Sequence, residues 1–443
     1  MLLSFGFGNH RSFADDQQLN LTRVYRSDSP ARSEDTSLPV AAIFGGNASG
    51  KSNALGALAY LRRLVRSSDR VSEPGGGIET DPFRLNPANP VSPSSFVVDL
   101  NLHGVRYTYG LRVDRSRVVE EWLYSYPLRH RRKIFERRGN DYSYGEEARG
   151  TSIAQVEGVT AENVLFLSTT ARFNQELVQP VYRWFLNRLI VAPSGEASAL
   201  RYRSNPPLEG LSRNEDRLRT MAELLRAADT GIEDVLVKTE DPGPPDEAVV
   251  EQYRRTFAAD PELAEVRIRR LSAPRSRLVF AHRGSSGPVD FDIDDESSGT
   301  IRLLHIADLA LAAISRGTTL LVDEIDASLH PLLTAKLIGL FQNPETNPRR
   351  GQLIFTSHDA TLLGTLDGIE VLRRDEIWFT SKDHATGAST LYPLSDYKPR
   401  KGESRERRYL AGSYDAIPDG SWELFEAALR ARQEDTDGSE EDA

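Results

Sequence analysis

The chain has 443 residues and no cysteine; 39% of its residues are hydrophobic and 27% are charged. This length predicts two or three domains, or one large domain with an insertion, and the composition is that of a folded soluble chain. The lack of thiols excludes disulfides, cysteine-ligated zinc, iron–sulfur clusters and cysteine nucleophiles. No apolar run approaches the roughly 20 residues that span a bilayer, and no export signal opens the sequence, so we expect a cytoplasmic protein without a membrane partner.

The net charge is −10, and much of it lies at the C-terminus. Six acids and no base occupy the last ten residues, which leaves a net charge of −4 for the rest of the chain. We expect residues 433–443 to form an acidic, solvated and disordered tail. The mild charge of the remainder neither requires nor excludes nucleic acid as a partner.

The hydrophobic pattern predicts strands and helices that alternate along much of the chain. The predicted strands are 2–7, 18–24, 40–44, 96–102, 105–114, 118–126, 278–282, 289–293, 318–322 and 352–356. Helices are expected from Ser52 onward, over 300–315 and between the last two strands. Residues 161–270 are expected to be mostly helical. This order predicts a parallel α/β core that is interrupted by a helical insertion.

A glycine-rich turn, residues 45–52, joins the third predicted strand to the helix that follows; we call it the phosphate loop. Its sequence, GGNASGKS, fits the pattern GxxxxGK[ST]. Glycines let the main chain fold around phosphates, so that its N–H groups and the helix N-terminus face the anion. Lys51 would neutralise β- and γ-phosphate charge, and Ser52 would ligate Mg²⁺. The residues assigned to nucleotide binding are Gly45, Asn47, Ser49, Gly50, Lys51 and Ser52.

Two carboxylates end the apolar strand 318–322. Ligands of open α/β sheets bind at the carboxyl ends of the strands, so Asp323 and Glu324 stand where a nucleotide would bind. We expect Asp323 to hold Mg²⁺ through its coordination shell and Glu324 to polarise the attacking water. An apolar strand that ends in two acids is also common as a structural feature. Its combination with the phosphate loop favours the catalytic interpretation.

Hydroxyl side chains and a glycine precede the helix that starts near Thr300. Free N–H groups and the helix dipole converge at a helix start, so Ser297, Gly299 and Thr300 are candidate ligands of a phosphate. The competing interpretation is plain helix capping by Ser297 or Ser298. The last predicted strand ends in Thr-Ser-His358-Asp, where His358 could contact a γ-phosphate or act as an ordinary loop residue.

These motifs stand in the order found in ATP-binding-cassette (ABC) ATPases. The chain resembles the ABC-like AAA family ATPases of the RloA-like group of bacterial defence loci, which are related to the OLD nucleases and more distantly to RecF and the chromosome-maintenance ATPases. The supporting details are NHRSF at 9–13, His282, LLVDE at 320–324, the turn at 325–331, RYLAGSY at 408–414 and Ile417-Pro418. The resemblance covers nearly the whole chain except the tail. Its one departure is the lid glutamine, for which Gln175 is only a weak candidate.

The resemblance implies a fold and a set of domains. The implied fold class is α/β, an ABC-type P-loop ATPase head with an antiparallel β subdomain and a helical insertion. The implied domains are 1–160 and 276–395 for the two halves of the ATPase head, 161–275 for the insertion, 396–432 for a C-terminal extension and 433–443 for the tail.

The resemblance also implies a mechanism that spacing alone does not show. Two copies would face head to tail, as a homodimer or within a higher homo-oligomer. Ser297, Gly299 and Thr300 would then act in trans on ATP held by the partner's phosphate loop. Glu324 and His358 would be the catalytic residues of Mg²⁺-dependent ATP hydrolysis. Asp326, in the turn after the carboxylates, would couple the two sites.

We expect the chain to be the ATP-hydrolysing sensor or regulatory subunit of an anti-phage defence system. Only 85 residues follow His358, too few for the TOPRIM nuclease that OLD enzymes carry after their ATPase, so the effector is expected to be a separately encoded TOPRIM-type nuclease. The alternative is a DNA-repair or chromosome-maintenance type ATPase that binds DNA ends or structures.

Other classes fit less well. A nuclease site within this chain would rest on Glu157 with Asp292 and Asp294, but no clean strand precedes Glu157. A GTPase would need the Asn-Lys-x-Asp reader of guanine, which is missing, so ATP is preferred. A transporter ATPase fits poorly with the altered signature and the long insertion. A nucleotide-gated binding module with negligible turnover would be distinguished by an ATPase assay.

Three basic stretches, 129–138, 267–277 and 400–408, are candidates for contact with nucleic acid. Interleaved acids equally favour an ion-paired, solvated face. A protein partner is expected to dock on the insertion or on the segment near 408–418, where Tyr409 and Tyr414 would be exposed anchors. Packing of that segment against the core is the competing interpretation.

Overall fold

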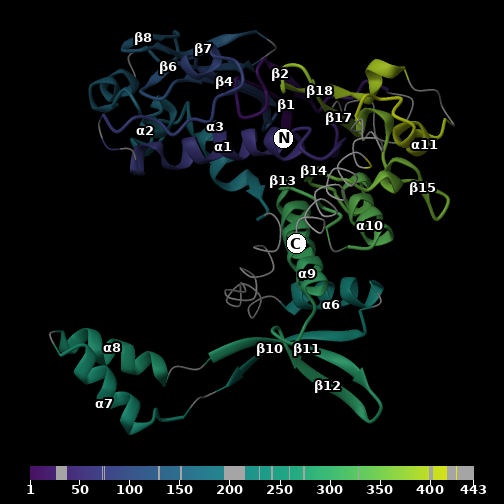
Figure 1. The fold of residues 1–443 in the computed structure, drawn as a ribbon. Helices are drawn as coiled ribbons and strands as arrows, with labels where there is room; N and C mark the ends of the chain where they lie inside the picture. The colour runs from purple at the N-terminus through teal and green to yellow at the C-terminus, as the bar shows by residue number, and fades with distance from the viewer. Residues whose placement is uncertain are drawn as a thin grey trace, which may run out of the picture. The chain divides into compact units, whose positions relative to one another are not determined.

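The computed structural model describes most of the chain. The described residues are 1–25, 37–71, 73, 75–127, 130–149, 152–193, 215–228, 230–240, 243–258, 260–272, 275–327, 329–398, 403–416 and 426. The acidic tail, Arg129, Arg400, Lys401 and Ile417-Pro418 lie outside these residues. Two compact units make up the chain (Figure 1): the first is Met1–Leu189 with Ile354–Ala443, and the second is Ile190–Leu353.

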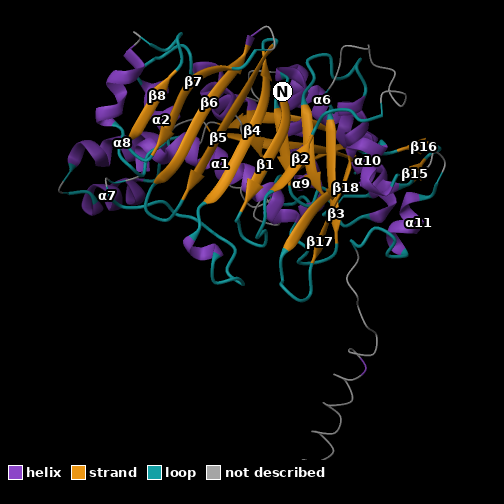
Figure 2. Ribbon diagram, turned by 90° about the horizontal axis from the view of Figure 1, so that it is seen from above, coloured by secondary structure: helices purple, strands orange, loops and turns teal. Residues whose placement is uncertain are grey.

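A seven-stranded antiparallel sheet lies in the first unit, in the order β2-β1-β4-β5-β6-β7-β8 (Figure 2). Its strands are β1 (Leu2–Gly8), β2 (Gln17–Asn20), β4 (Ser94–Leu102), β5 (Val105–Val113), β6 (Val118–Tyr126), β7 (Arg132–Arg138) and β8 (Asp141–Tyr144). In β4, alternation buries Phe96, Val98 and Leu100 on one face. The strands up to β6 lie where they were predicted, except that β2 ends at Asn20 rather than at residue 24, and β7 and β8 were not predicted.

The long helix of the first unit, α1 (Lys51–Val71), starts soon after β3 (Val40–Gly45). Its apolar side is buried through Leu55, Leu58 and Leu61, as their spacing predicted. The short helices that follow in this unit are η2 (Asn89–Val91), η4 (Ser152–Val159), α2 (Phe166–Arg172), α3 (Gln179–Arg183) and the π-helical turn η5 (Trp184–Arg188). Among these, α2 and η5 pack against α1.

In the first unit, β3 is a fully buried strand with a neighbour on each side. On one side β17 (Ile377–Lys382) runs parallel to it, with Phe379 opposite Phe44. On the other side, past the end of β14 (Gln352–Thr356), the Ser357 N–H donates to the Ile43 oxygen at 3.1 Å. Strand β18 (Ser389–Pro393) pairs antiparallel with β17. The remaining elements of this unit are η6 (Ala360–Leu363), β15 (Thr365–Leu366), β16 (Ile369–Glu370), η7 (Arg374–Glu376), η8 (Leu394–Tyr397) and α11 (Arg405–Leu410).

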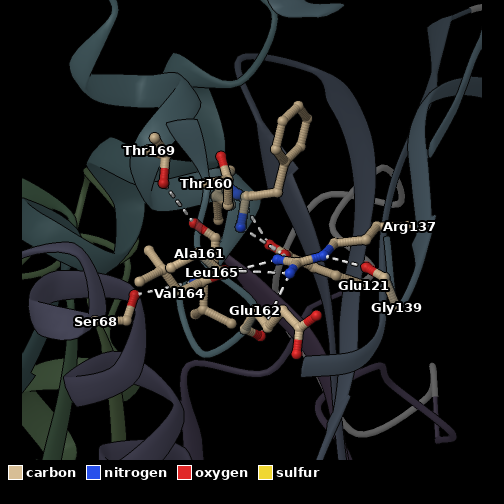
Figure 3. A network of polar contacts seen from close by, with 12 residues as sticks. Ser68, Glu121, Arg137, Gly139, Thr160, Ala161, Glu162, Val164, Leu165 and Thr169 are labelled. Carbon is tan, nitrogen blue, oxygen red and sulfur yellow. Dashed lines mark hydrogen bonds and ion pairs between the residues drawn. The ribbon is translucent and has the colours of Figure 1, made fainter. Parts of the chain in front are cut away.

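A buried ion pair ties the antiparallel sheet to the loop that leads into α2 (Figure 3). Glu121 on β6 and Arg137 on β7 are both closed to solvent, and their Oε2 and Nη1 atoms are 3.9 Å apart. Glu121 accepts hydrogen bonds from the N–H groups of Phe166 and Leu167 at 2.6 and 2.9 Å. Arg137 donates to the Val164 oxygen at 2.7 Å. These hydrogen bonds compensate for the desolvation of both charges.

The second unit contains the long helix α9 (Ser298–Arg316) and the buried strand β13 (Thr319–Val322). The strand is hydrogen-bonded on both sides. On one side Ala192, next to β9 (Leu189–Val191), donates its N–H to the Leu321 oxygen at 2.9 Å. On the other side Gln352, at the start of β14, donates its N–H to the Thr318 oxygen at 2.9 Å. Helix α10 (Pro331–Gln342) lies between β13 and β14 in the sequence, as predicted.

A three-stranded antiparallel sheet completes the second unit (Figure 1). Its strands are β10 (Ile232–Glu240), β11 (Arg275–Gly284) and β12 (Gly287–Asp292). Helix α6 (Glu215–Ala227) packs on β10, and α7 (Glu247–Thr256) and α8 (Pro261–Leu271) lie between β10 and β11 in the sequence. The segment 161–270 is therefore a mixture of helices and strands, because β9 and β10 lie in it. The predicted α/β fold class is confirmed.

Among the described residues, α9 is the one helix whose length and apolar composition would also fit a membrane span. Its contacts are those of a core helix: Ile301, Leu304 and Ala310 are buried, and Asp308 forms an ion pair with Arg217 of α6.

Candidate nucleotide-binding site

The phosphate loop leaves β3 and enters α1, as predicted. Gly45 and Gly50 have φ angles of 157° and 114°, a range that residues with side chains rarely adopt. A Cβ atom on Gly45 would lie 2.5 Å from the Thr380 oxygen on β17, so a larger residue would have to displace that strand. The two glycines therefore allow the main chain to turn tightly against its neighbours.

Lys51 is the first residue of α1, and it is only 5% exposed. Its Nζ atom donates to the oxygens of Gly45 and Gly46 at 2.8 and 2.9 Å. The ammonium group therefore lies along the phosphate loop, where its charge adds to that of the α1 N-terminus. An anion at this position would be attracted both by the Lys51 ammonium group and by the N-terminus of α1.

The polar side chains of the phosphate loop divide into exposed and buried groups. Asn47 and Ser52 are exposed and so are accessible to a ligand. Ser49 is buried, and its Oγ shares a hydrogen bond of 2.7 Å with Thr380 Oγ1. The Ser49 side chain therefore links the loop to Thr380 on β17, and contact of Ser49 with a nucleotide stays a prediction.

The segment NHRSF at 9–13 lies beside the start of α1, a contact that the sequence did not predict. The Asn53 side-chain amide donates to Ser12 Oγ at 2.9 Å, and the Ser389 N–H on β18 donates to the Ser12 oxygen at 2.7 Å. A Cβ atom on Gly50 would come within 2.7 Å of Ser389 Oγ. Ser12, Asn53 and Ser389 are distant in sequence, so their proximity could not be predicted from local pattern. The NHRSF motif was the one available sign that this segment belongs to the site.

An open pocket of about 450 Å³ lies next to this segment, in the first unit. Arg11, Arg84 and Lys382 contribute positive charge to its wall. Asp81 forms ion pairs with Arg11 at 3.5 Å and with Arg84 at 3.6 Å. Three cations thus face one acid, which favours an anionic ligand.

His358 follows β14, whose end is bonded to β3. His358 and the phosphate loop therefore stand at the carboxyl ends of neighbouring strands, where ligands of such sheets bind. His358 is exposed. The next residue, Asp359, caps η6 through its Oδ1 atom, which accepts a hydrogen bond from the Thr361 N–H at 3.0 Å. The contact of His358 with a γ-phosphate stays a prediction.

In the second unit, the two predicted carboxylates follow β13 directly. Asp323 and Glu324 are half-buried, and the Ala327 N–H donates to the Glu324 oxygen at 3.0 Å to close a turn. Glu324 has a φ angle of 50°, in the left-handed region that is uncommon for a residue with a side chain. The carboxylate thus sits on locally strained backbone, which the surroundings must hold in place.

Arg302 on α9 supplies that support. It is only 5% exposed, and its Nη2 atom donates to the main-chain oxygens of Asp323 at 3.2 Å and Glu324 at 2.5 Å. Burial lowers the pKa of Arg302, an effect opposed by the carboxylates of Glu324, Asp326 and Asp323. Arg302 was not predicted as a site residue, although an arginine among the apolar residues near the start of α9 was the available signal.

Ser297 is the N-cap of α9, because its Oγ accepts a hydrogen bond from the Thr300 N–H at 3.0 Å. The capping interpretation is therefore correct for this side chain. The preceding Glu296 is buried and bonded to His282 Nε2 at 2.5 Å. Ser297 is exposed, while Gly299 and Thr300 are half-exposed, so the helix start is accessible. Its action on a partner's nucleotide stays a prediction.

The predicted Mg²⁺ ligands are Ser52 in the first unit and Asp323 in the second, and their joint action on one metal stays a prediction. Within the described ranges, no group of three or more His, Asp or Glu side chains could form a metal cage of its own. Mg²⁺ commonly binds one or two carboxylates together with substrate phosphates and water. The exposed hydroxyl of Ser52 and the half-buried carboxylate of Asp323 are ligands of this type.

Many of the basic residues that were candidates for nucleic acid form ion pairs. The pairs are Arg132–Glu147, Lys133–Glu136, Arg137–Glu121, Arg138–Glu120, Arg277–Asp292, Arg405–Glu370 and Arg408–Glu403. Arg137 and Arg405 are buried, so for these two residues the predicted contact with an external phosphate is wrong. Arg267 and Arg269 on α8 are exposed.

The prediction that Tyr409 and Tyr414 are exposed anchors is also wrong. Tyr409 is 6% exposed and Tyr414 is 0% exposed. Both rings stack on Phe379, at centroid distances of 5.8 and 5.0 Å. The competing interpretation, packing of this segment on the core, is correct.

Two weaker candidates gain no support. Gln175 lies between α2 and α3, where its side-chain amide donates to the Phe173 oxygen at 3.0 Å. Glu157 lies on the 3₁₀ helix η4 rather than after a strand, and Asp292 is paired with Arg277.

The family model described as "AAA domain, putative AbiEii toxin, Type IV TA system" matches residues 40–364, which is more than half of the chain. The chain belongs to this family. The matched range of this AAA domain includes the phosphate loop, the start of α9, the acidic pair and His358. The predicted membership of an AAA ATPase family is thereby confirmed.

No curated protein matches the chain. Solved structures of SMC heads are similar to it at low identity. An SMC head bound to the C-winged helix domain of ScpA is 12% identical, with 90% of this chain and 99% of that chain covered and a TM-score of 0.46. An SMC head domain from Thermotoga maritima is 13% identical, with 88% of this chain and 98% of that chain covered and a TM-score of 0.39. An SMC head with an extended coiled coil bound to the C-terminal domain of ScpA, derived from Pyrococcus furiosus, is 12% identical, with 90% of this chain and 97% of that chain covered and a TM-score of 0.40.

Proposed function

We propose that the chain is an ABC-like, Mg²⁺-dependent ATPase that acts in the cytoplasm as the sensor or regulatory subunit of a bacterial anti-phage defence system. The observation that carries the ATPase assignment is the phosphate loop, where Gly45 and Gly50 pack too closely for a side chain and Lys51 lies along the turn. The family description, which names a toxin of a type IV TA system, supports a role in defence. The RloA-like motif order supports it as well.

Each proposed residue has a defined task. On this proposal, the main-chain N–H groups of the loop and the Lys51 ammonium would bind the phosphates, and Ser52 and Asp323 would each serve as a ligand of Mg²⁺. The metal would supply neutralisation of phosphate charge. Glu324 would accept a proton from the attacking water, and His358 would contact the γ-phosphate.

ATP binding tests the assignment. Lys51→Ala removes the cation of the loop, whereas Lys336→Ala removes an exposed lysine on α10. With a fluorescent ATP analogue and Mg²⁺, we expect Lys51→Ala to bind at least about tenfold more weakly than the wild type, because a charge-assisted contact is lost. Lys336→Ala is expected to bind like the wild type. Equal affinity of both variants would contradict the assignment.

We further propose that two copies act head to tail, with Ser297, Gly299 and Thr300 of one copy on the nucleotide of the other. The accessible start of α9 supports this arrangement. Lys51→Ala and Ser297→Arg are each expected to be inactive alone, while their mixture recovers part of the activity, because a mixed dimer keeps one site with both parts intact. Demonstrated mixed dimers without activity would rule out action in trans.

The effector is proposed to be a separately encoded TOPRIM-type nuclease. The test is a phage challenge of cells that carry the locus with Lys51→Ala, combined with affinity capture of the neighbouring gene product in each nucleotide state. We expect loss of protection and a stable association in at least one state. Unchanged protection, or no association, would leave an ATPase without this role.

A further inference from the structure

The hydroxyl of Thr380, on β17, contacts the phosphate loop within the first unit. Thr380 is fully buried and stands opposite Gly45 in the parallel pairing of β17 with β3. Its Oγ1 atom shares a hydrogen bond of 2.7 Å with Ser49 Oγ and donates to the Phe44 oxygen at 3.4 Å. A hydroxyl has one proton to donate and two lone pairs that can accept. With the Thr380 proton directed at Phe44, the Ser49 hydroxyl therefore donates to Thr380.

Ser49 connects this contact to the rest of the phosphate loop. The Ser49 N–H donates to the Gly46 oxygen at 3.3 Å, and the same oxygen accepts a hydrogen bond from Lys51 Nζ at 2.9 Å. A Cβ atom on Gly45 would lie 2.6 Å from Ser49 Oγ, so the serine side chain also lies directly against the start of the loop. A shift of Ser49 would therefore change the turn to which the Lys51 ammonium is bonded.

The strand that pairs with β17 contacts the other end of the loop. Ser389, at the start of β18, donates its N–H to the Ser12 oxygen at 2.7 Å. A Cβ atom on Gly50 would lie 2.7 Å from Ser389 Oγ. The antiparallel pair of β17 and β18 thus borders both glycines of the loop, Gly45 beside Thr380 and Gly50 beside Ser389.

We propose that Thr380 is a positioning residue of the nucleotide site, which holds the phosphate loop in its binding geometry through the Ser49 hydroxyl. The inference rests on the proposed function and adds a residue that lies 331 positions after Ser49, outside the sequence motifs. A buried hydroxyl without an acceptor is unfavourable, so loss of the Thr380 oxygen favours a loop geometry in which Ser49 turns away from β17. The loop is then no longer preorganised, and nucleotide binding has to restore its geometry at a cost in affinity.

Two substitutions of Thr380 separate its hydroxyl from its shape. Thr380→Val removes the hydroxyl and keeps the branched side chain, whereas Thr380→Ser keeps the hydroxyl and removes the methyl group. The control is Thr170→Val on α2, because Thr170 is fully buried and its Oγ1 has no hydrogen-bond partner within the described ranges. Thermal unfolding of each full-length variant reports whether the fold is intact.

The first readout needs no nucleotide. Hydrogen exchange of the main-chain amides over residues 45–52 is expected to be at least about fivefold faster in Thr380→Val than in the wild type, and within about twofold of the wild type in Thr380→Ser and Thr170→Val. Wild-type exchange in Thr380→Val overturns the proposal, as does equal acceleration in Thr380→Ser or Thr170→Val. If Thr380→Val unfolds, Ser49→Ala breaks the same hydrogen bond from the loop side and is expected to show the acceleration; wild-type exchange in its folded form overturns the proposal.

The second readout is nucleotide affinity, measured with Mg²⁺ and the fluorescent ATP analogue. We expect about fivefold to tenfold weaker binding in Thr380→Val and wild-type binding in Thr380→Ser and Thr170→Val. When Ser49 is already alanine, adding Thr380→Val is expected to change the affinity by less than about twofold, because the hydrogen bond is already lost. Wild-type affinity in Thr380→Val, or the same loss of affinity in both backgrounds, overturns the positioning role. A wild-type chain that binds no nucleotide contradicts the proposed function instead, and hydrogen exchange then decides whether Thr380 holds the loop.

Discussion

Arg302 and Glu324 are joined by a hydrogen bond of 2.5 Å, from the guanidinium Nη2 to the main-chain oxygen of the glutamate. The arginine lies on α9 shortly after its N-cap, Ser297, and the glutamate lies in the acidic turn after β13. The start of α9 and the strained backbone of Glu324 are therefore mechanically linked within one unit. A displacement at the helix start would move Arg302 and, with it, the turn that presents the proposed catalytic base.

Arg302→Lys tests this link. A lysine is a point charge that cannot reproduce the planar guanidinium, so the left-handed conformation of Glu324 loses support. We expect ATP turnover to fall about tenfold or more, with ATP affinity within about twofold of the wild type. Steady-state kinetics and equilibrium binding measure the two effects. The control is Arg316→Lys, at the exposed end of the same helix, which is expected to behave like the wild type. Wild-type turnover in Arg302→Lys would refute the link.

The buried ion pair predicts a large difference between adjacent glutamates. Glu121→Gln leaves the Arg137 charge uncompensated in the core, which is expected to lower the free energy of unfolding by about 3 kcal/mol or more. Glu120→Gln removes a partly exposed carboxylate 3.9 Å from Arg112 and Arg138, and we expect a loss of less than about 1 kcal/mol. Urea denaturation measures both. Similar losses for the two variants would show that Glu121 does not hold this part of the sheet.

His10 predicts a pH dependence of stability. It is buried between Tyr60 and Phe96, and burial lowers its pKa from 6.5 to about 4. Above pH 6.5 both states are neutral and stability is complete. As the pH falls from 6.5 to 4, the unfolded state binds a proton that the folded state does not, so stability decreases.

His10→Phe should remove this part of the dependence. The loss of stability between pH 7.5 and 5 is expected to shrink by roughly 2 kcal/mol relative to the wild type. The same substitution at exposed His384 is expected to leave the dependence unchanged. Thermal or urea unfolding at the two pH values gives the comparison. An identical pH dependence in His10→Phe and the wild type would show that His10 titrates normally.

The elements that carry the motifs were predictable from local pattern. Both β3 and β13 are short, fully buried and mostly apolar strands, and each is followed by a distinctive group, the glycine-rich turn or the acidic pair. Helix α9 begins two residues before its predicted start, at the cap that Ser297 provides. In these three elements the residues of the element and its immediate neighbours were enough to predict it.

Other elements gave no such signal. The parallel pairing of Phe379 with Phe44 joins distant parts of the chain, so the local sequence around β3 does not predict that β17 is its neighbour. In β7, Ile134 and Phe135 are both buried beside a register shift, which breaks the alternation expected of a strand. Tyr409 was predicted to face a partner because composition does not distinguish an aromatic residue that packs on its own chain from one that packs on another.

Contact of α8 with nucleic acid would depend on Arg267 and Arg269, which are exposed. If both contact duplex DNA phosphates, the plot of log affinity against log salt concentration should become less steep by about 0.9 for each residue changed to alanine. Fluorescence anisotropy over a salt series measures the slope. Binding that does not depend on salt, or that is unchanged in the double variant, would exclude this surface.

The central claim is that this chain hydrolyses ATP with Glu324 as the catalytic base, and Glu324→Gln tests it most directly. The substitution keeps the size of the side chain and removes its ability to accept a proton. The measurement is single-turnover hydrolysis of radiolabelled ATP by wild type and variant, with the bound nucleotide quantified in the same samples. We predict that the variant binds ATP at least as tightly as the wild type and cleaves it at least about a hundredfold more slowly. Hydrolysis by the variant at the wild-type rate would contradict the account.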